Sequence, residues 1–234
     1  MVMGEEHIEF DGFTPQALML LAENRFHNSK AFYEEHKQAL NELAIRPMRQ
    51  IAQAMAPQMM ALDPLMNLNP VRMVSRIRRD TRFTKDKSLY RANVWTVFSR
   101  PKASFPHAPC FWFEVTQEAY SYGLGYYDTT PALMQAFRKQ MAYQPRLFER
   151  ECRELRNAGF SFEGERYKRD KEGPIPERLK PYYNLKDIVV IRRGTDFGVL
   201  QSEAILGELR DGYHRLEGMY RFLMDAQARV EQAD

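Results

Sequence analysis

The chain has 234 residues, of which 44% are hydrophobic and 28% are charged, and its formal net charge is +3. A chain of this length can bury a sizeable core, and its composition excludes the disordered, collagenous and fibrous classes. No apolar stretch approaches the ~20 residues of a membrane span, and the start of the chain lacks a basic stretch followed by an apolar one. We therefore expect a soluble, cytoplasmic protein with no membrane partner.

Residues 14–60 are predicted to be helical. A threonine-proline pair, typical of a helix start, predicts a first helix over about 15–26. A second pattern begins near Ser29 and keeps apolar residues three or four positions apart. It predicts a long helix with a kink near Pro47, because proline removes a backbone hydrogen bond.

Residues 71–127 are predicted to form an antiparallel sheet. Four short segments rich in Val, Phe, Trp and Tyr alternate with stretches that hold Pro, Lys, Ser or Gly, a pattern typical of a β-meander. These segments are residues 71–79, 93–100, 109–117 and 120–127. In the last one, Gly123 and Gly125 lack the third glycine and the strand-helix context of a dinucleotide site, so they predict a close backbone approach or a bulge.

The chain then returns to helices. We predict a helical region over 131–157 interrupted at Pro145, a loop and strand over 160–193, and a C-terminal helix over 201–231. The loop part, 160–183, is either a functional lid or a flexible surface excursion. Helices, strands and then helices predict one α+β domain over residues 1–234, with an antiparallel β-meander sheet packed by N-terminal, middle and C-terminal helices.

Residues 71–91 carry the strongest local charge of the chain. Eight basic side chains against two acidic ones give this stretch a net charge of +6, whereas the remaining residues sum to −3. The basic residues are Arg72, Arg76, Arg78, Arg79, Arg82, Lys85, Lys87 and Arg91, and the acidic ones are Asp80 and Asp86.

Two interpretations of this segment stay open. Side chains alternate along a strand, so Arg76 and Arg78 would share one face and could hold a carboxylate or phosphate with their planar guanidinium groups. Alternatively, the segment is a solvated basic face whose two aspartates pair locally with neighbouring cations. The candidate ligand-binding residues are Arg76, Arg78, Arg79, Asp80, Arg82, Lys85, Asp86, Lys87 and Tyr90.

The same segment carries a family resemblance. The run Arg79-Asp80-Thr81-Arg82-Phe83-Thr84-Lys85-Asp86-Lys87-Ser88-Leu89-Tyr90-Arg91 resembles the signature Arg-Asp-Thr-Arg-Phe-Ser-Lys-Asp-Lys-x-Pro-Tyr-Lys of the domain of unknown function numbered twenty-four sixty-one. Leu89 departs from its usual proline and Arg91 from its lysine. Weaker similarities extend over about residues 10–225, at 28–33, 46–48, 122–126, Arg138 and 167–169. The resemblance implies a single α+β domain and transfers no reaction.

The sequence supports three functions. We place first the binding of a small anionic ligand, phosphate- or carboxylate-bearing, through residues 76–91. The alternatives are an enzyme that uses the same pocket, and a module that binds nucleic acid or protein. Nearby aromatic residues (Phe83, Tyr90 and Trp95) favour nucleic acid, but the acidic remainder of the chain does not. No metal-ligand spacing or cofactor motif is found, so we expect neither, and no catalytic residue is assigned.

Overall fold

The computed structural model describes residue 10 and residues 12–82 and 84–231. The chain forms two compact units. The first unit holds the residues up to Val97 together with Phe113–Ser121 and Gly194–Arg210; the second holds Phe98–Trp112, Tyr122–Arg193 and the chain from Asp211 onward. The single domain over residues 1–234 stays a prediction.

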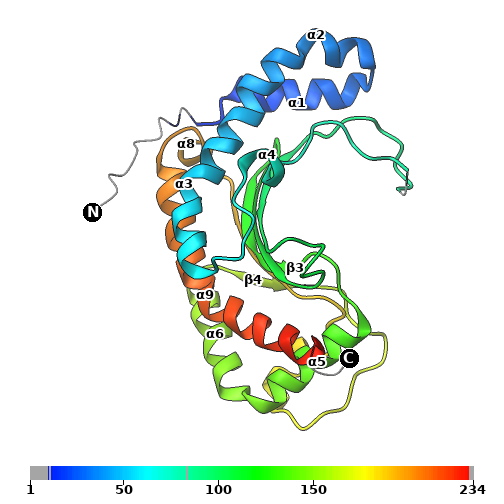
Figure 1. Cartoon of the computed structure of the whole chain (residues 1–234), viewed down its shortest axis with the longest axis vertical. Helices are drawn as coiled ribbons and strands as arrows, with labels where there is room; N and C mark the ends of the chain where they lie inside the picture. The colour runs from blue at the N-terminus through cyan, green and yellow to red at the C-terminus, as the bar shows by residue number, and fades with distance from the viewer. Residues whose placement is uncertain (1–9, 11, 83, 232–234) are drawn as a thin grey trace. The chain divides into compact units, whose positions relative to one another are not determined.

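The first unit begins with a helical hairpin. Helix α1 spans Pro15–His27 and α2 spans Lys30–Leu40, and they run side by side in opposite directions (Figure 1). Each begins at a hydroxyl residue, Thr14 or Ser29, whose side chain accepts a hydrogen bond from a backbone N–H of the first turn. The first predicted helix is therefore confirmed.

The expected interruption near Pro47 takes the form of a π-helical turn. Helix α2 is followed without a break by η1 (Asn41–Ile45) and then by α3 (Arg46–Leu62). Proline has no N–H, and its ring crowds the carbonyl four residues earlier. A wider turn immediately before it relieves that crowding, and the N–H of Arg46 reaches back five residues to the carbonyl of Asn41.

The strands hydrogen-bond in the order β1-β2-β3-β5-β4. They form an antiparallel sheet, in which Phe162 of β4 pairs with Val190 of β5. The strands are β1 (Val94–Phe98), β2 (Pro109–Val115), β3 (Tyr120–Tyr126), β4 (Ser161–Glu163) and β5 (Val189–Gly194). The α+β class and the three strands predicted between 93 and 127 are confirmed.

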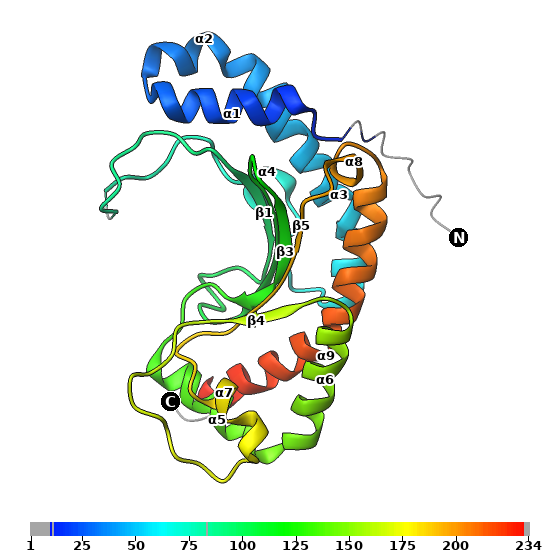
Figure 2. The same ribbon diagram turned by 180° about the vertical axis from the view of Figure 1, so that it is seen from behind.

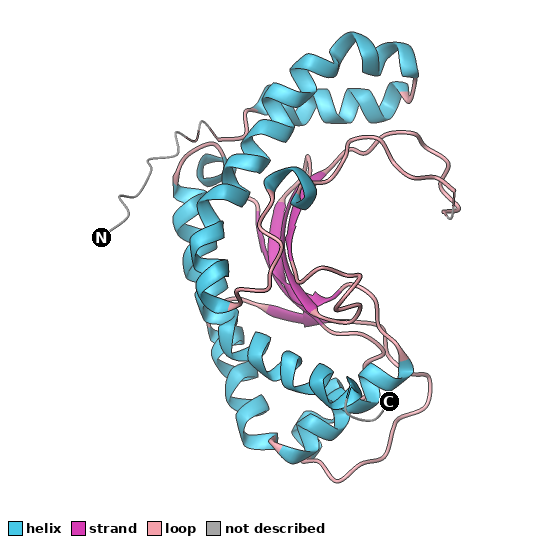
Figure 3. Ribbon diagram, in the orientation of Figure 1, coloured by secondary structure: helices cyan, strands magenta, loops and turns pink. Residues whose placement is uncertain are grey.

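The strand predicted over 71–79 is wrong at its start. Pro70–Met73 forms the short helix α4, because the Asn69 side chain accepts a hydrogen bond from the N–H of Val71 (3.0 Å) and proline occupies the first helical position. Beyond it the chain makes isolated antiparallel bridges at 74 with 96 and at 78 with 90. The five residues 74–78 thus face the seven residues 90–96, and this mismatch prevents a regular ladder. Figure 3 accordingly draws the following residues as loop.

The second unit contains the middle helices. Helix α5 spans Pro131–Tyr143 and α6 spans Pro145–Asn157, so the predicted break at Pro145 is confirmed. The stretch 160–183 is not a bare loop, because it holds β4, the 3₁₀ turn η2 (Glu177–Leu179) and α7 (Lys180–Tyr183). The long connection between β4 and α7 passes close to α5 and α7 (Figure 2). Helix α8 (Phe197–Leu200) precedes the last helix, α9 (Ala204–Glu231).

Two glycines of β3 let β5 approach closely. A Cβ atom at Gly125 would lie 2.6 Å from the carbonyl oxygen of Ile188. One at Gly123 would overlap the carbonyl of Val190 and lie 2.6 Å from the ring of Trp112. The close approach predicted from these glycines is confirmed.

Both units bury apolar side chains. In the first, Met48, Ile51 and Met55 of α3 are fully buried. In the second, the rings of Phe137 and Phe148 pack edge to face at 5.6 Å. No helix in the described part of the chain is both long and apolar enough to span a membrane.

Candidate functional site

The basic segment lies in the first unit as a loop closed by a short antiparallel contact. Arg78 and Tyr90 form an isolated antiparallel β-bridge, and the N–H of Arg79 donates to the carbonyl of Leu89 (2.8 Å). Residues 80–82 and 84–88 extend beyond this contact as a long loop next to the α1–α2 hairpin (Figure 1). Phe83, one of the aromatic residues that favour nucleic acid, lies outside the described residues.

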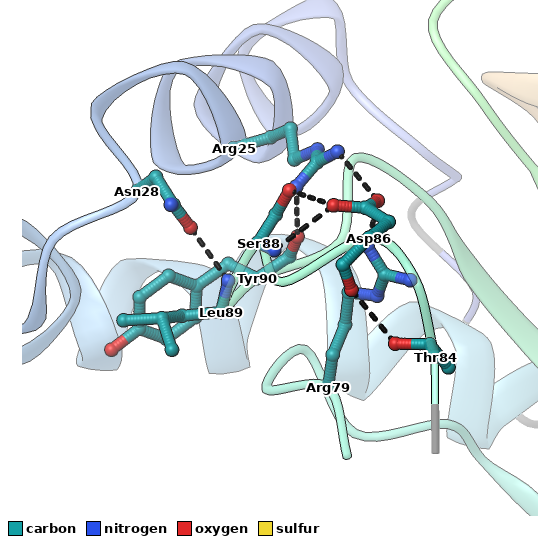
Figure 4. Close-up of polar contacts among 8 residues, drawn as sticks. All are labelled: Arg25, Asn28, Arg79, Thr84, Asp86, Ser88, Leu89 and Tyr90. Carbon is teal, nitrogen blue, oxygen red and sulfur yellow. Dashed lines mark hydrogen bonds and ion pairs between the residues drawn. The ribbon is translucent and has the colours of Figure 1, made fainter. Parts of the chain in front are cut away.

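Asp86 organises the returning half of the loop. One carboxylate oxygen accepts from the N–H of Ser88 (2.9 Å) and from its hydroxyl, and the other contacts the guanidinium groups of Arg79 and Arg25 (3.0 Å to Arg25) (Figure 4). The hydrogen bonds from Ser88, followed by that from Arg79, hold the pKa of Asp86 well below its usual range. Asp86 is therefore ionised at neutral pH and braces the loop.

The end of α1 holds the loop from the other side. Asn28 caps the helix in the left-handed conformation (φ 48°), and its side-chain oxygen accepts from the N–H of Leu89 (2.6 Å). Arg25 donates to the carbonyl of Tyr90 at 3.5 Å (Figure 4). The ring of Tyr90, which is buried, stacks on that of Tyr33 with 4.7 Å between the ring centroids. The hairpin thus fixes residues 86–90.

The site therefore includes two residues that the charge pattern missed, Arg25 and Asn28. A basic residue in the last turn of a helix usually complements the helix dipole, so Arg25 gives no separate signal in the sequence. Asn28 lies in the family-like stretch 28–33, which is the only signal that could have found it.

Asp80 and Arg82 pair with each other. The Arg82 guanidinium donates to both carboxylate oxygens (Nε to Oδ1, 3.0 Å; Nη2 to Oδ2, 2.6 Å), and the Arg82 N–H donates to Oδ1 (3.1 Å). These bonds lower the pKa of Asp80 to about 2. Both side chains are exposed, so the pair shapes the loop locally and contributes little to global stability.

The remaining cations lie on the surface. Arg76 and Arg78 are exposed on either side of the buried Ile77, as strand alternation predicts for this short stretch. Lys85 and Lys87 are also exposed, and the Lys87 ammonium donates to the carbonyl of Thr81 (2.8 Å). Within the described residues, the side chains of Arg76 and Arg78 form no ion pair with a carboxylate.

Arg91 connects this surface to the sheet. Its Nε donates to the carbonyl of Arg76 (3.2 Å), and its guanidinium lies 4.4 Å from the ring centroid of Trp95. Trp95 is half-buried in β1. One face of this indole is therefore occupied by Arg91.

The segment thus brings together most of the candidate residues but in three different roles. Arg79, Asp86 and Tyr90 hold the loop in place, and Asp80 pairs with Arg82. Arg76, Arg78, Lys85 and Lys87 present their charge to solvent. Both acids with lowered pKa values are ionised at neutral pH, and an ionised carboxylate cannot act as a general acid.

Other reactive groups lie elsewhere. Cys110 and Cys152 are free and buried, and burial raises the pKa of each thiol to about 12. Such thiols are poor nucleophiles at neutral pH. Over residues 12–82 and 84–231, no three His, Cys, Asp or Glu side chains gather as a group that could hold a metal ion.

The fold and the segment define an α+β protein with an exposed Arg/Lys loop that is braced by two internal carboxylates. Residues 16–222 match the family DUF2461, described as a conserved hypothetical protein, and the chain belongs to this family. A search of curated proteins finds no match.

Proposed function

We propose that the protein binds a small anionic ligand, phosphate- or carboxylate-bearing, on the surface formed by Arg76, Arg78, Lys85 and Lys87. The observation that carries this proposal is the exposed pair Arg76 and Arg78, two guanidinium groups on one side of the chain with no carboxylate partner among the described residues. The two acids of the segment are already engaged by Arg79, Arg25 and Arg82. The positive charge of this surface is therefore available to a ligand.

The chemistry suits an oxyanion. A guanidinium offers two parallel N–H donors that match the two oxygens of a carboxylate or phosphate, whereas an ammonium acts as a point charge. In this proposal Arg76 and Arg78 bind the oxygens, and Lys85 and Lys87 add attraction from the loop. Arg79, Asp86 and the buried Tyr90 position the loop without touching the ligand.

Nucleic acid is the second candidate, favoured by the exposure of residues 84–87 as a basic stretch. Its phosphates need only exposed cations, but base stacking needs an open aromatic face. Tyr90 is buried, and one face of Trp95 is covered by Arg91. These contacts favour the small anion. An enzyme acting through the same residues stays a prediction, and so does the cytoplasmic location, which the two buried free thiols support.

Calorimetric titration tests the proposal. The chain is titrated with inorganic phosphate, sulfate, a nucleotide panel and a single-stranded oligonucleotide at low and moderate salt. A small anion site gives saturable one-to-one binding of phosphate or a nucleotide that Arg76→Gln and Arg78→Gln weaken. Matched control Arg46→Gln removes an exposed arginine of α3 and leaves the binding unchanged. Binding of the oligonucleotide alone, with a steep loss at moderate salt, would reject the small-ligand proposal for the second candidate.

A further inference from the structure

The second unit contains a buried arginine. Arg138 of α5 is 9% exposed, and its Nη1 donates to the carbonyl of Leu185 at 3.4 Å. No described carboxylate lies within ion-pair distance of it. A buried charge is costly unless a counter-charge or several hydrogen bonds compensate it. Among the described residues, Arg138 makes one long hydrogen bond, which leaves its charge under-compensated there.

Two donor groups of Arg138 are not used by the described residues. Its Nε and Nη2 make no hydrogen bond to another described residue, and neither is among the sealed, unpartnered side-chain atoms of the described chain. The protein therefore holds the guanidinium in place, and 9% of the residue surface stays exposed.

Two aromatic rings lie near the Arg138 guanidinium, and two further cations lie near one of those rings. The Arg138 guanidinium lies 5.6 Å from the ring centroid of Tyr167 and 5.9 Å from that of Tyr183. The Lys171 ammonium lies 4.7 Å from the Tyr167 centroid, and that of Lys186 lies 6.0 Å from it. Lys186 is neutralised by Glu165 at 3.1 Å. Arg138 and Lys171 thus gather at one tyrosine without a carboxylate partner of their own within the described residues.

The loop that carries Tyr167 and Lys171 is tied down. The N–H of Tyr167 donates to the backbone carbonyl of Asn184 (3.0 Å), and the N–H of Lys171 donates to the side-chain oxygen of Asn184 (2.6 Å). Next to them, Arg166 and Leu185 form an antiparallel bridge. Asn184 is buried. The arrangement around Arg138 is therefore built before any ligand arrives.

We propose that Arg138 and Lys171 form a second binding site, which holds the carboxylate or phosphate group of a small ligand against Tyr167 and Tyr183. Arg138 supplies the paired donors from its buried position, and the exposed Lys171 supplies a second charge. The two tyrosine rings flank the part of the ligand next to its anionic group.

NMR of the arginine side chains gives a readout for this site alone. The Nε–Hε signal of Arg138 is assigned by its loss in Arg138→Lys, and the chain carries Arg76→Gln and Arg78→Gln so that the first site is silent. The probes are inorganic phosphate and benzoate, titrated separately. We expect at least one probe to shift the Arg138 signal saturably. An unshifted signal at saturating concentrations of both would overturn the proposal.

Variants separate binding from packing. Lys171 is exposed, and we expect Lys171→Gln to lower the affinity for the probe about two- to fivefold, as for the loss of one exposed charge contact. Arg138→Lys lacks the reporting signal, so its affinity is measured by calorimetry; the probe should bind at least ~30-fold more weakly, because the substitution breaks a paired contact to a desolvated charge. The control Lys139→Gln removes the exposed neighbour in α5 and should change nothing. If Arg138→Lys does not fold, Lys171→Gln still decides: an affinity equal to that of the control would reject the site.

Because the first site is already silenced, the outcome is independent of the function proposed for residues 76–91. Binding that survives in Arg76→Gln/Arg78→Gln and is weakened about two- to fivefold by Lys171→Gln supports the second site even if the first binds no anion.

Discussion

Two basic regions of this protein differ in how their positive charge is compensated. Around 76–91, the acids Asp80 and Asp86 lie within the segment and the cations are mostly exposed. Around Arg138, the guanidinium is buried and the described residues provide no carboxylate for it. Water screens the first region, so its local charge of +5 costs little free energy. The second region can tolerate its charge only through fixed surroundings, and this difference determines how each should respond to mutation.

The largest change in stability is expected in the buried sheet, where a fixed close contact is even less tolerant of change than the surroundings of Arg138. Gly123→Ala would place a methyl group against the carbonyl of Val190 and the ring of Trp112, in a sheet that cannot move aside easily. We expect the free energy of unfolding to fall by about 3 kcal/mol, measured by denaturant titration. The control is Gly207→Ala in α9, where the added atom meets nothing within 4 Å. Equal stability of the two variants would show that β3 and β5 do not need this close contact.

A smaller change of opposite sign is expected at the buried charge. Arg138→Met keeps much of the side-chain volume and removes an under-compensated charge, so the free energy of unfolding should rise by about 1 kcal/mol. The matched variant Arg78→Met, in the exposed segment, should leave it within about 0.5 kcal/mol of the parent. A greater loss of stability in Arg138→Met than in Arg78→Met would show that Arg138 stabilises the fold, and this would weaken the case for a ligand there.

In the exposed region, the effect should stay local. Asp86→Ala removes the acceptor of Ser88, Arg79 and Arg25, and we expect backbone amide exchange in residues 84–91 to become roughly tenfold faster while the helices keep their protection. Hydrogen exchange with mass spectrometry measures both. Asp80→Asn is the comparison, since it leaves those three contacts intact. Unchanged exchange in Asp86→Ala would show that the α1–α2 hairpin alone holds the loop.

The smallest effect is a pH dependence. The pKa of Asp80 is about 2 in the folded chain against an ordinary value of 3.8, so its pairing with Arg82 contributes at pH values above 3.8 and is lost as the pH falls through 2. An NMR titration of the Asp80 carboxyl resonance should give a midpoint near 2. In Arg82→Gln the midpoint should move up towards 3.8. A midpoint that does not respond to this substitution would assign the low pKa to another cause.

Much of the fold follows from local patterns in the sequence. Helix starts at Thr14 and Ser29, the break at Pro145 and the glycines of β3 each have a local physical cause, and the structure bears them out. The predicted start of the strand over 71–79 is wrong, because the Asn69 cap and Pro70 favour a helical turn over the extended conformation that the apolar residues indicate.

The site was harder to predict because it depends on contacts distant in the sequence. The positive charge of 71–91 is visible in the sequence, but the pairing of Asp86 with Arg25 joins residues 61 positions apart. Strand alternation placed Arg76 and Arg78 correctly, yet nothing local shows that Tyr90 turns inward to stack on Tyr33. Arg138 is marked in the sequence by its family similarity alone, because a charged residue in an amphipathic helix does not reveal that it is buried.

The most direct test of anion binding at residues 76–91 keeps the charge and changes only its geometry. Arg78→Lys and the control Arg46→Lys are titrated with inorganic phosphate by calorimetry at two salt concentrations, next to the parent chain. If Arg78 binds the oxyanion through its paired N–H donors, Arg78→Lys should lose roughly tenfold in affinity while Arg46→Lys matches the parent. Equal phosphate affinities for all three proteins, or binding that disappears in all three at the higher salt, would contradict a built site and leave a diffuse basic surface.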